Sequence, residues 1–306
     1  MKALVTGGAG FIGSNLVDAL LGRGDEVTVI DDLSTGRRDN LAQAGDADLQ
    51  ELDIRDYDAV ADVVGRVQPE LVFHLAAQID VRRSVADPAF DAGINVQGTI
   101  NLLRASLEHG VGRFVNTSTG GAIYGENEIV PAPESHPVAP KAPYGLSKFC
   151  AEGYANLFAR LHELSTVSLR YGNVYGPRQD PLGEAGVIAI YCGLALEGGE
   201  PIVFGDGLQT RDYVYVGDVV SANLAAAAGG AGGAFNVGTE VETTVLDLVD
   251  AIRPQAVGDF APQHKPERAG EVQRSTLDCT RAREELGWKA EVSLEDGLRR
   301  TLDSLR

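Results

Sequence analysis

Short apolar runs alternate with helical patterns through the first 170 residues of this 306-residue chain. Each run is rich in Val, Ile, Leu or Phe and lacks the strict alternation of a half-exposed strand. Such runs are typical of strands that are buried on both faces of a parallel sheet. We expect strands at 3–6, 26–30, 71–75, 114–117 and 167–171, and helices at 15–21, 96–109 and 148–164. The alternation predicts an α/β fold with a doubly wound parallel sheet.

The alternation of strand-like and helical segments is weaker in the C-terminal part. Gly and Pro cluster over 172–186, and helices are expected at 187–196, 219–228 and 245–252. The Ala- and Gly-rich stretch 225–234 is interpreted as a helix end and a turn, because a strand-like run resumes at 235–237. We therefore expect a Rossmann-like domain over 1–170, with its sheet completed by segments near 213–240. A smaller α/β substrate domain over 171–306 is expected to be interleaved with it.

The composition disfavours several classes of partner. The formal net charge of −18 argues against nucleic acid and anionic membranes, because a basic face supplies the affinity for both. No apolar run approaches the roughly 20 residues that span a bilayer, and no signal-peptide pattern opens the chain. Cys150, Cys192 and Cys279 are far apart and lack metal-ligand spacing. They indicate reduced thiols in a cytoplasmic protein without a metal site.

Three glycines after the first expected strand predict a dinucleotide site. Gly7, Gly10 and Gly13 form G-x-x-G-x-x-G, and a helix can begin at Ser14. The first glycine permits a tight turn, the second lets the backbone approach a pyrophosphate, and the third lets helix and strand pack closely. The helix N-terminus then offers free N–H groups to the phosphates. A glycine-rich turn that binds nothing is the alternative, but the strand, the helix and an acid at a suitable distance favour the dinucleotide.

That acid is Asp31, at the end of the second strand, where a carboxylate can hold the adenosine ribose hydroxyls. A carboxylate there repels a 2′-phosphate and favours NAD over NADP, although Arg37 and Arg38 are near enough in sequence to accept that phosphate. Asp32 is interpreted chiefly as a turn residue. Asp53 follows another short strand and is a candidate acceptor for the adenine amino group, and a solvated loop acid fits its spacing almost as well.

Tyr144 and Lys148 lie four residues apart in PYGLSK, and Pro143 can begin a helix that places them on one face. The ammonium, together with a nicotinamide cation, would lower the phenol pKa from its usual value of about 10. The phenolate would then act as general base towards a sugar or alcohol hydroxyl. The cluster NTSTGG at 116–121 follows a strand, and one of its hydroxyls is expected to hydrogen-bond the reacting oxygen. Strand-end capping is the alternative, especially for Thr117.

These motifs resemble the extended short-chain dehydrogenase/reductase family, and within it the UDP-glucose (UDP-galactose) 4-epimerases. The matching phrases span almost the whole chain in the family's order: TGGAGFIGS, DDLSTG, VFHLAAQ, NVQGT, STGGAIYG, APYGLSK, RYGNVYGPRQDP, GEAGV, FGDG, TRDYVYVGD and FNVGT. The resemblance implies an isomerase that interconverts UDP-glucose and UDP-galactose through a 4-keto sugar. It also implies that NAD is regenerated in each cycle and stays tightly bound.

The resemblance assigns roles to individual residues. Tyr144 would be the base, and Lys148 would hold the nicotinamide ribose. The residues implied to line the NAD site are Gly7, Gly10, Phe11, Ile12, Gly13, Asp31, Asp32, Ser34, Thr35, Gly36, Asp53, Ile54, Leu75, Ala76, Ala77, Gln78, Asn95, Tyr144 and Lys148. The residues implied to bind the UDP-sugar are Ser118, Thr119, Asn173, Val187, Arg211, Arg268 and Ser275. His74 is interpreted as strand-end packing.

One departure from the family pattern concerns the catalytic hydroxyl. The family's Ser or Thr usually lies four residues before the Tyr of V-Y-G or I-Y-G, and here that place is Gly120. The pair Gly120-Gly121 suggests a one-residue insertion, so Thr119 is assigned the role, with Ser118 as the alternative. The same pair lacks the acidic residues that 4,6-dehydratases need, which counts against dehydration.

The substrate preference is left open. Ser275 aligns with a position where a large residue narrows the sugar pocket, so UDP-GlcNAc and UDP-GalNAc are candidate substrates. Arg82 and Arg83 could face a C6 carboxylate, which would indicate a UDP-glucuronate 4-epimerase or decarboxylase; surface salt bridging is the favoured explanation. A non-catalytic NAD-binding regulator is a remote alternative, because such proteins often lose the Tyr or the Lys. The family also implies a homodimer, with the helices near 96–109 and 148–164 paired across a two-fold axis.

Overall fold

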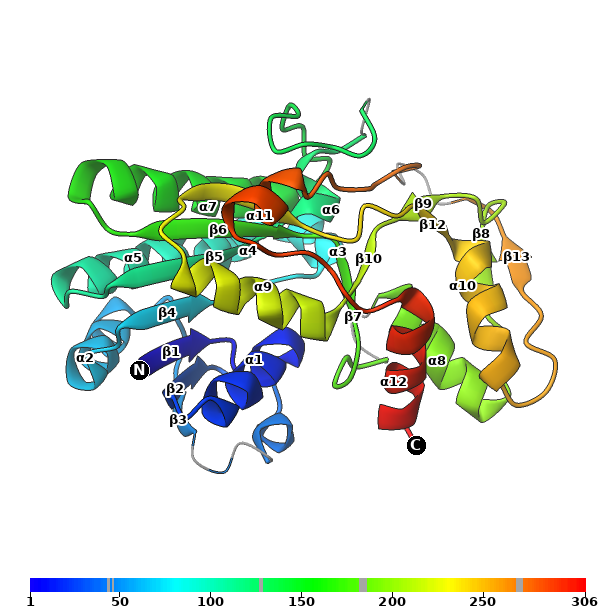
Figure 1. Cartoon of the computed structure of the whole chain (residues 1–306), viewed down its shortest axis with the longest axis horizontal. Helices are drawn as coiled ribbons and strands as arrows, with labels where there is room; N and C mark the ends of the chain where they lie inside the picture. Colours follow the sequence, from blue (N-terminus) through cyan, green and yellow to red (C-terminus); the bar gives the residue numbers. More distant parts are fainter. Residues whose placement is uncertain (43–44, 46, 127–128, 182–185, 268–271) are drawn as a thin grey trace.

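A seven-stranded parallel sheet forms the centre of the computed structural model, which describes residues 1–306 except 43–44, 46, 127–128, 182–185 and 268–271 (Figure 1). The strand order is β11-β6-β5-β4-β1-β2-β3. These strands are β1 (Lys2–Thr6), β2 (Glu26–Asp31), β3 (Asp48–Glu51), β4 (Leu71–His74), β5 (Arg113–Thr119), β6 (Thr166–Tyr171) and β11 (Gly233–Val237). Each strand expected from the sequence is present within two residues of its expected ends. The fold is therefore the doubly wound, Rossmann-like α/β fold that the sequence predicts.

Helices cover both faces of the sheet. On one face α1 (Phe11–Gly22) packs against α9 (Val216–Ala228), and α11 (Thr280–Glu285) lies against β11. On the other face α5 contacts both α2 and α7. The helices of that side are α2 (Tyr57–Val67), α3 (Val81–Ala86), α4 (Pro88–Ala92), α5 (Thr99–Glu108), α6 (Gly120–Ile123) and α7 (Pro143–His162). The helix expected over 96–109 begins instead as a π-helix, η2 (Gly93–Gly98), and continues as α5.

A second group of elements follows β6 and lies to the right in Figure 1. Its strands form separate pairs, β7 (Asn173–Tyr175) with β10 (Tyr213–Tyr215), β9 (Thr210–Arg211) with β12 (Thr243–Thr244), and β8 (Ile202–Phe204) with β13 (Gln263–Lys265). Of the segment near 213–240 that was expected to complete the sheet, β11 joins its edge, whereas β10 pairs with β7 outside it. The remaining elements are α8 (Val187–Glu197), α10 (Val245–Ile252), α12 (Leu294–Ser304) and the 3-10 helices η1 (Arg38–Leu41) and η3 (Arg253–Gln255).

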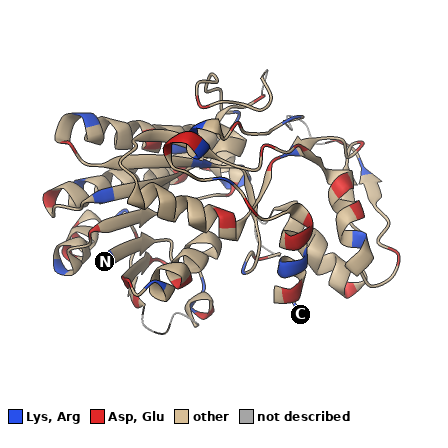
Figure 2. Ribbon diagram, in the orientation of Figure 1, with Lys and Arg blue, Asp and Glu red and all other residues tan. Residues whose placement is uncertain are grey.

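Three apolar clusters stabilise this arrangement. Two lie on the opposite faces of the main sheet, and the third joins α8, α10 and α12 to the strands of the second group. Figure 2 shows Lys and Arg residues scattered among the acidic ones, which outnumber them 44 to 26 in the sequence. None of the helices in the described ranges has the length and apolar character needed to cross a membrane.

Candidate active site

The strand order places the candidate site at the carboxyl edge of the sheet. From β1 the chain moves outwards to β2 and β3, and it then returns to β4 on the other side of β1. The connections that leave β1 and β4 therefore run in opposite directions, and open α/β sheets bind their ligands at such a point. The glycine loop, the segment after β4 and the end of β5 all meet this edge.

The glycine loop has the geometry that its spacing predicts. Gly7 has a positive φ of 69°, and an added Cβ there would lie 2.6 Å from the backbone nitrogen of Ala76. An added Cβ at Gly13 would lie 2.1 Å from the carbonyl oxygen of Gly7, so α1 packs directly on the loop. Gly10 precedes α1 without a side-chain cap, and the first turn carries no acidic residue. The positive end of α1 is therefore suited to a phosphate.

Asp31 lies at the end of β2 beside this loop. Its carboxylate accepts hydrogen bonds from the backbone N–H groups of Ala9 and Leu33, both at 2.9 Å. An added Cβ at Gly36 would lie 2.7 Å from the Asp31 Oδ1, so glycine leaves room for the carboxylate. Burial raises the pKa of Asp31, and the two N–H groups oppose that rise. Each oxygen keeps a second lone pair that can accept a ribose hydroxyl.

The neighbouring acids are engaged in local turns. Asp32 accepts hydrogen bonds from the backbone N–H and the hydroxyl of Ser34, at 3.0 and 2.6 Å. Asp53 accepts from the backbone N–H of Arg55 at 2.8 Å and from its Nε at 2.9 Å, and Arg55 lowers the pKa of this carboxyl. These contacts match the turn interpretation of Asp32 and the loop-acid alternative for Asp53. Their contribution to a cofactor site stays a prediction.

A buried polar network connects the segment after β4 to α7. The Asn95 amide is paired with the Gln78 backbone, donating to its carbonyl and accepting from its N–H, both at 2.9 Å. Asn95 also donates to Asp91 at 3.1 Å and to the Ser147 hydroxyl at 3.0 Å, and this hydroxyl donates to the carbonyl of Tyr144. Asn95 belongs to the π-helix η2, an irregularity that is frequent at functional sites. The network fixes the helix turn that carries Tyr144.

The structure brings Thr119, rather than Ser118, to Tyr144. Thr119 is the last residue of β5, and its hydroxyl lies close enough to the phenol of Tyr144 to oppose the rise of the phenol pKa. The Ser118 hydroxyl is buried and has no hydrogen-bond partner among the described residues. An added Cβ at Gly120 would lie 2.5 Å from the Leu277 side chain, so a glycine at this position lets the two segments approach closely. The geometry favours Thr119 as the hydroxyl that faces a substrate.

The expected effect of Lys148 on Tyr144 is not found in the protein alone. Burial raises the pKa of Tyr144 to about 12, the Thr119 hydroxyl opposes this rise and the charge of Asp91 adds to it. Lys148 is not among the groups that shift this pKa. Burial also lowers the pKa of Lys148 to about 8, against the effect of Asp91. The prediction of a lowered phenol pKa concerned a site that also holds a nicotinamide cation, so it stays a prediction; in the protein alone, desolvation raises the pKa of this phenol.

Four of the other expected substrate residues, Asn173, Val187, Arg211 and Ser275, lie in the part of the chain that follows β6. An added Cβ at Gly121 would lie 3.5 Å from the Asn173 Oδ1, so the Asn173 side chain faces the residues after Thr119. Arg211 donates to the carbonyls of Thr210 and Val272, at 2.7 and 2.8 Å. Val187 begins α8, and Ser275 is buried. Arg268 lies outside the described residues.

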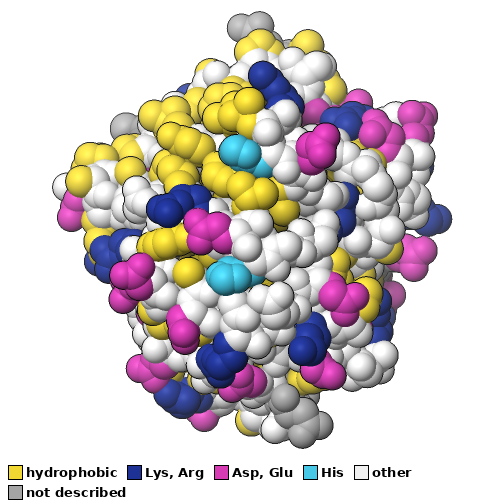
Figure 3. All heavy atoms as spheres, turned by 90° about the vertical axis from the view of Figure 1, so that its left-hand side faces the viewer, with side chains coloured by type: hydrophobic (Ala, Val, Ile, Leu, Met, Phe, Trp, Pro, Cys, Tyr) yellow, Lys and Arg dark blue, Asp and Glu magenta, His cyan; other side chains and the backbone are white. Residues whose placement is uncertain are grey.

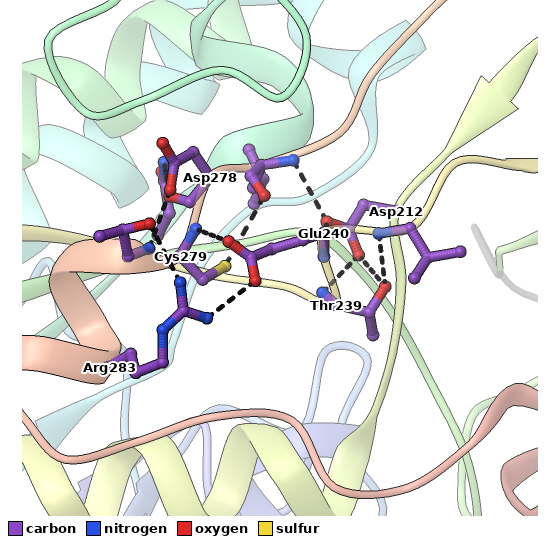
Figure 4. Close-up of polar contacts among 10 residues, drawn as sticks. Asp212, Thr239, Glu240, Asp278, Cys279 and Arg283 are labelled. Atoms are coloured by element: carbon purple, nitrogen blue, oxygen red, sulfur yellow. Dashed lines mark hydrogen bonds and ion pairs between the residues drawn. The ribbon is translucent and has the colours of Figure 1, made fainter.

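Asp212 joins three segments behind this region (Figure 4). Its carboxylate accepts the backbone N–H and the hydroxyl of Thr239, both at 2.7 Å. It also accepts the backbone N–H groups of Glu240 and Leu277, both at 3.2 Å. Burial raises the pKa of Asp212, and these donors oppose the rise. The carboxylate thereby holds the segment that contains Ser275 against β9 and β10.

A cavity beside Arg211 contains residues to which the sequence reasoning gave no role. Its volume is about 530 Å³, and it is lined by Phe204, Gly205, Asp206, Gln209, Glu267 and Gln273. The backbone N–H of Thr210 donates to the carbonyl of Gln273 at 2.9 Å, so the cavity adjoins β9. The matching phrase FGDG gave a signal for Phe204, but no motif contains Gln209 or Gln273.

Two further expectations concern residues near this edge of the sheet. His74 is buried, with its ring nitrogens 2.8 Å from the Thr6 hydroxyl and 2.9 Å from the Thr99 hydroxyl, and burial lowers its pKa to about 3. This neutral, fully bonded ring has the packing role that the sequence suggested. The Arg83 guanidinium is exposed and lies 3.8 Å from the centroid of the Phe90 ring.

Comparisons with known proteins agree with this arrangement. Residues 3–238 match the NAD dependent epimerase/dehydratase family. A UDP-glucose 4-epimerase of Mycolicibacterium smegmatis is 47% identical, with 100% of this chain and 99% of that protein covered. The UDP-glucose 4-epimerase structure from Thermotoga maritima with UDP-glucose has a TM-score of 0.97 at 48% identity, covering 100% of this chain and 99% of that one. The Thermus thermophilus UDP-glucose 4-epimerase in complex with NAD has a TM-score of 0.93 at 43% identity, covering 100% and 99%.

The residues present fit the cofactor in the family's description. The uncapped start of α1 suits a pyrophosphate, the glycine loop leaves no room for side chains where α1 meets β1, and the Asp31 carboxylate can accept ribose hydroxyls. On the fold, the site geometry and these matches, the chain belongs to the NAD dependent epimerase/dehydratase family.

Proposed function

We propose that this chain is a UDP-hexose 4-epimerase that interconverts UDP-glucose and UDP-galactose with tightly bound NAD. The observation that carries the proposal is the proximity of the Thr119 hydroxyl to the Tyr144 phenol at the carboxyl edge of the sheet, the edge that also carries the glycine loop. A phenol and a hydroxyl at this edge could meet the C4 hydroxyl of a sugar beside a nicotinamide. The names of the Mycolicibacterium and Thermotoga relatives support the same reaction.

In this mechanism Tyr144 takes the proton from O4 of the sugar and later returns it. Held by the glycine loop and Asp31, NAD would supply reversible hydride acceptance at C4 of the sugar. Thr119 lies beside the phenol and holds the proton path between Tyr144 and O4. Lys148, on the same helix face, supplies a positive charge near the phenol and holds the nicotinamide ribose.

The UDP group must stay anchored while the sugar turns over. We assign this anchoring to Asn173, Val187, Arg211 and Arg268, with the cavity beside Arg211 as a candidate space for part of the nucleotide. Binding energy from groups remote from C4 can then support a mobile intermediate. The division into an NAD-binding domain over 1–170 and an interleaved UDP-sugar domain over 171–306 remains part of this proposal.

The pKa values of the two proposed catalytic groups predict how activity depends on pH. A phenol with a pKa of about 12 is ionised in only about one molecule in 10⁴ at pH 8, so it needs nearby positive charge to act as a base. Lys148, with a pKa of about 8, loses its charge as the pH rises above that value. The fraction of molecules with an ionised Tyr144 and a charged Lys148 should therefore rise towards pH 8 and level off above it, because Lys148 then loses its charge as fast as Tyr144 ionises.

The alternatives differ in their support. Buried Ser275 keeps UDP-GlcNAc and UDP-GalNAc as candidate additional substrates. A UDP-glucuronate 4-epimerase or decarboxylase would need Arg82 or Arg83 at the sugar, but Arg83 is exposed and lies over Phe90. A non-catalytic regulator would not need the Thr119–Tyr144 contact.

We also propose a homodimer that forms through α5 and α7. Figure 3 shows hydrophobic side chains gathered in the upper part of one face, and such a patch marks interaction sites. Exposed apolar side chains recur along α7 at Leu146, Phe149, Tyr154, Leu157 and Leu161. Light scattering should report a dimer that Leu157→Glu weakens, whereas Val257→Glu, at an exposed site off these helices, should leave it intact. A monomeric wild type would contradict this proposal.

Two remaining aspects are also proposals. Cys150, Cys192 and Cys279 are free thiols in the structure, which fits the cytoplasmic location expected from the sequence. The described residues contain no group of three or more His, Cys, Asp or Glu side chains suited to a metal ion.

The test of the main proposal is to incubate the purified protein with UDP-galactose, UDP-GalNAc and UDP-glucuronate separately, without added NAD, and to follow the sugars by NMR. We expect UDP-galactose and UDP-glucose to interconvert. Thr119→Val should slow this reaction about 10- to 100-fold or more, whereas Ser118→Ala should have a small effect. Reaction of UDP-glucuronate alone would overturn the assignment. If Ser118→Ala reacts slowly and Thr119→Val reacts at the wild-type rate, the catalytic role belongs to the Ser118 hydroxyl.

A further inference from the structure

Ser84 is a buried serine on the short helix α3, and its hydroxyl contacts the backbone of the proposed catalytic tyrosine. Its exposed fraction is 0%. The Ser84 Oγ accepts a hydrogen bond from the backbone N–H of Tyr144 at 3.2 Å and donates one to the carbonyl of Val81 at 2.7 Å. The donation stays within α3 and directs the hydroxyl proton there, so a lone pair of the oxygen faces α7.

This contact satisfies a group that α7 itself leaves without a partner. The helix begins at Pro143, and Ala142 before it provides no side-chain cap. The first N–H groups of a helix lack partners within the helix, and a serine just before the helix often accepts one of them. Proline has no N–H, so Tyr144 carries the first N–H group of α7 that needs an acceptor. Here the serine that accepts it belongs to another helix, 60 positions earlier in the chain.

The carbonyl of Tyr144 is held by a second serine. Ser147 donates a hydrogen bond to this carbonyl at 3.0 Å, and the Ser147 hydroxyl accepts one from the Asn95 side chain at 3.0 Å. Asn95 is paired in turn with the backbone of Gln78. Both backbone polar groups of Tyr144 are therefore connected to the part of the chain that lies between β4 and α5.

The position of α3 does not depend on its contact with Tyr144. The Asp80 side chain caps α3 by accepting two backbone N–H groups of its first turn, at 2.8 and 3.0 Å. The Gln78 side chain accepts the backbone N–H of Asp80 at 2.5 Å and donates to the Asp80 carbonyl at 3.0 Å. The helix also packs against both α4 and α7. Ser84 is thus held by its own surroundings and can serve as a fixed point for the tyrosine.

We propose that Ser84 is a positioning residue that caps α7 from α3 and fixes the main chain of Tyr144 at the proposed active site. The catalytic consequence rests on the proposed function of Tyr144, whereas the cap itself does not. Proton transfer requires the phenol within hydrogen-bond reach of the sugar hydroxyl, and a misplacement of about 1 Å can slow an enzyme about 10²-fold. Loss of the cap should therefore lower kcat and leave KM for the UDP-sugar little changed.

The cap is tested by hydrogen exchange of the Tyr144 amide in protein labelled with nitrogen-15 at its tyrosines. The chain has nine tyrosines, and Tyr144→Phe identifies the relevant resonance. In the wild type we expect slow exchange, although amides at helix ends usually exchange fast. Ser84→Ala should speed the exchange about tenfold or more. A Tyr144 amide that exchanges fast in the wild type, or as slowly in Ser84→Ala as in the wild type, would overturn the inference.

The effect on catalysis is tested by kinetics against two matched variants. Ser84→Ala should lower kcat for UDP-galactose about 10- to 100-fold, with KM and NAD content little changed. Ser106→Ala removes an equally buried hydroxyl on α5 that has no partner among the described residues, so kcat should stay at its wild-type value. Ser293→Ala removes the hydroxyl that caps α12 by accepting the Asp296 N–H at 3.2 Å, so it should lower the Tm without lowering kcat.

The outcomes separate this inference from the proposed function. Faster amide exchange in Ser84→Ala with an unchanged kcat would overturn the inference and leave the function standing. An equal loss of kcat in Ser293→Ala would also overturn it, because the loss of any helix cap would then have the same effect. A wild type that converts no UDP-sugar would overturn the function, while faster amide exchange in Ser84→Ala would still support the cap.

Ser84→Cys keeps the inference testable if Ser84→Ala does not fold. A thiol is similar to a hydroxyl in shape but is a weak acceptor. The variant should therefore speed the exchange of the Tyr144 amide and lower kcat, in the same direction as alanine. Wild-type exchange and a wild-type kcat in Ser84→Cys would overturn the inference.

Discussion

Replacing Gly13 by Ala should damage both the fold and the cofactor site, and the structure gives the size of the effect. The added Cβ would lie 2.1 Å from the carbonyl oxygen of Gly7 and 2.8 Å from the Cα of Gly8. These are backbone atoms, so no rotamer change can relieve the contact. Contacts of real Cβ atoms are essentially never shorter than 3.0 Å, so α1 or the loop must move by nearly an ångström.

Overpacking of this kind typically costs about 1–3 kcal/mol, and a backbone clash belongs at the upper end. Ala gains about 1 kcal/mol over Gly within a helix, which leaves a net loss of about 2 kcal/mol in the free energy of unfolding. For a chain of 306 residues the unfolding entropy is about 0.6 kcal/mol per degree, so the Tm should fall by about 3 °C. Because the displaced atoms form the phosphate cradle, bound NAD should be lost as well.

The assay is a thermal unfolding curve together with the NAD content of the purified protein, measured by acid release. Gly22→Ala is the matched control, because Gly22 ends the same helix and an added Cβ there would meet no atom within 4 Å. It should retain NAD and raise the Tm slightly or leave it unchanged. The reasoning is refuted if Gly13→Ala retains NAD and a wild-type Tm.

Three other predictions concern single side chains. His74 has a pKa of about 3 in the folded protein and about 6.5 in the unfolded chain, so it contributes stability above pH 6.5 that is lost as the pH falls towards 3. This contribution is at most about 5 kcal/mol. The free energy of unfolding, measured in urea across that pH range, should depend less on pH in His74→Asn than in the wild type. Asp31→Ser removes two buried charge-assisted hydrogen bonds and the repulsion of a 2′-phosphate. The affinity for NAD, measured by calorimetry, should therefore fall about 10- to 100-fold, and the ratio of NADP affinity to NAD affinity should rise. An unchanged preference for NAD would contradict this. Tyr144→Phe should lower kcat about 10²- to 10⁴-fold with NAD content unchanged, and wild-type turnover in this variant would show that Tyr144 is not the base.

Much of the fold could be predicted from the sequence because its signals are local. A run buried on both faces of a sheet must be apolar throughout, so the five expected strands were found within two residues of their ends. The glycine spacing was equally informative, since the positive φ at Gly7 and the close packing at Gly13 admit no side chain. The sequence missed the π-helix η2, because an extra residue in a helical turn leaves no periodic signal.

The electrostatics of the candidate site were decided by tertiary structure. Spacing placed Lys148 one turn from Tyr144 and suggested a lowered phenol pKa, but spacing carries no information on desolvation, which raises that pKa to about 12. The choice between Ser118 and Thr119 likewise depended on which hydroxyl the strand turns towards α7.

Residues distant in sequence show the same division. Asp91 matched no motif, and its buried carboxylate accepts hydrogen bonds from Gln78 and Asn95 only because the fold brings the segment after β4 against α4. Residue type, local periodicity and fixed spacing determined the sheet, the glycine loop and the family of this chain. Burial and contacts between remote segments determined the charges, because the cost of a charge depends on the solvent and the partners that only the folded chain provides.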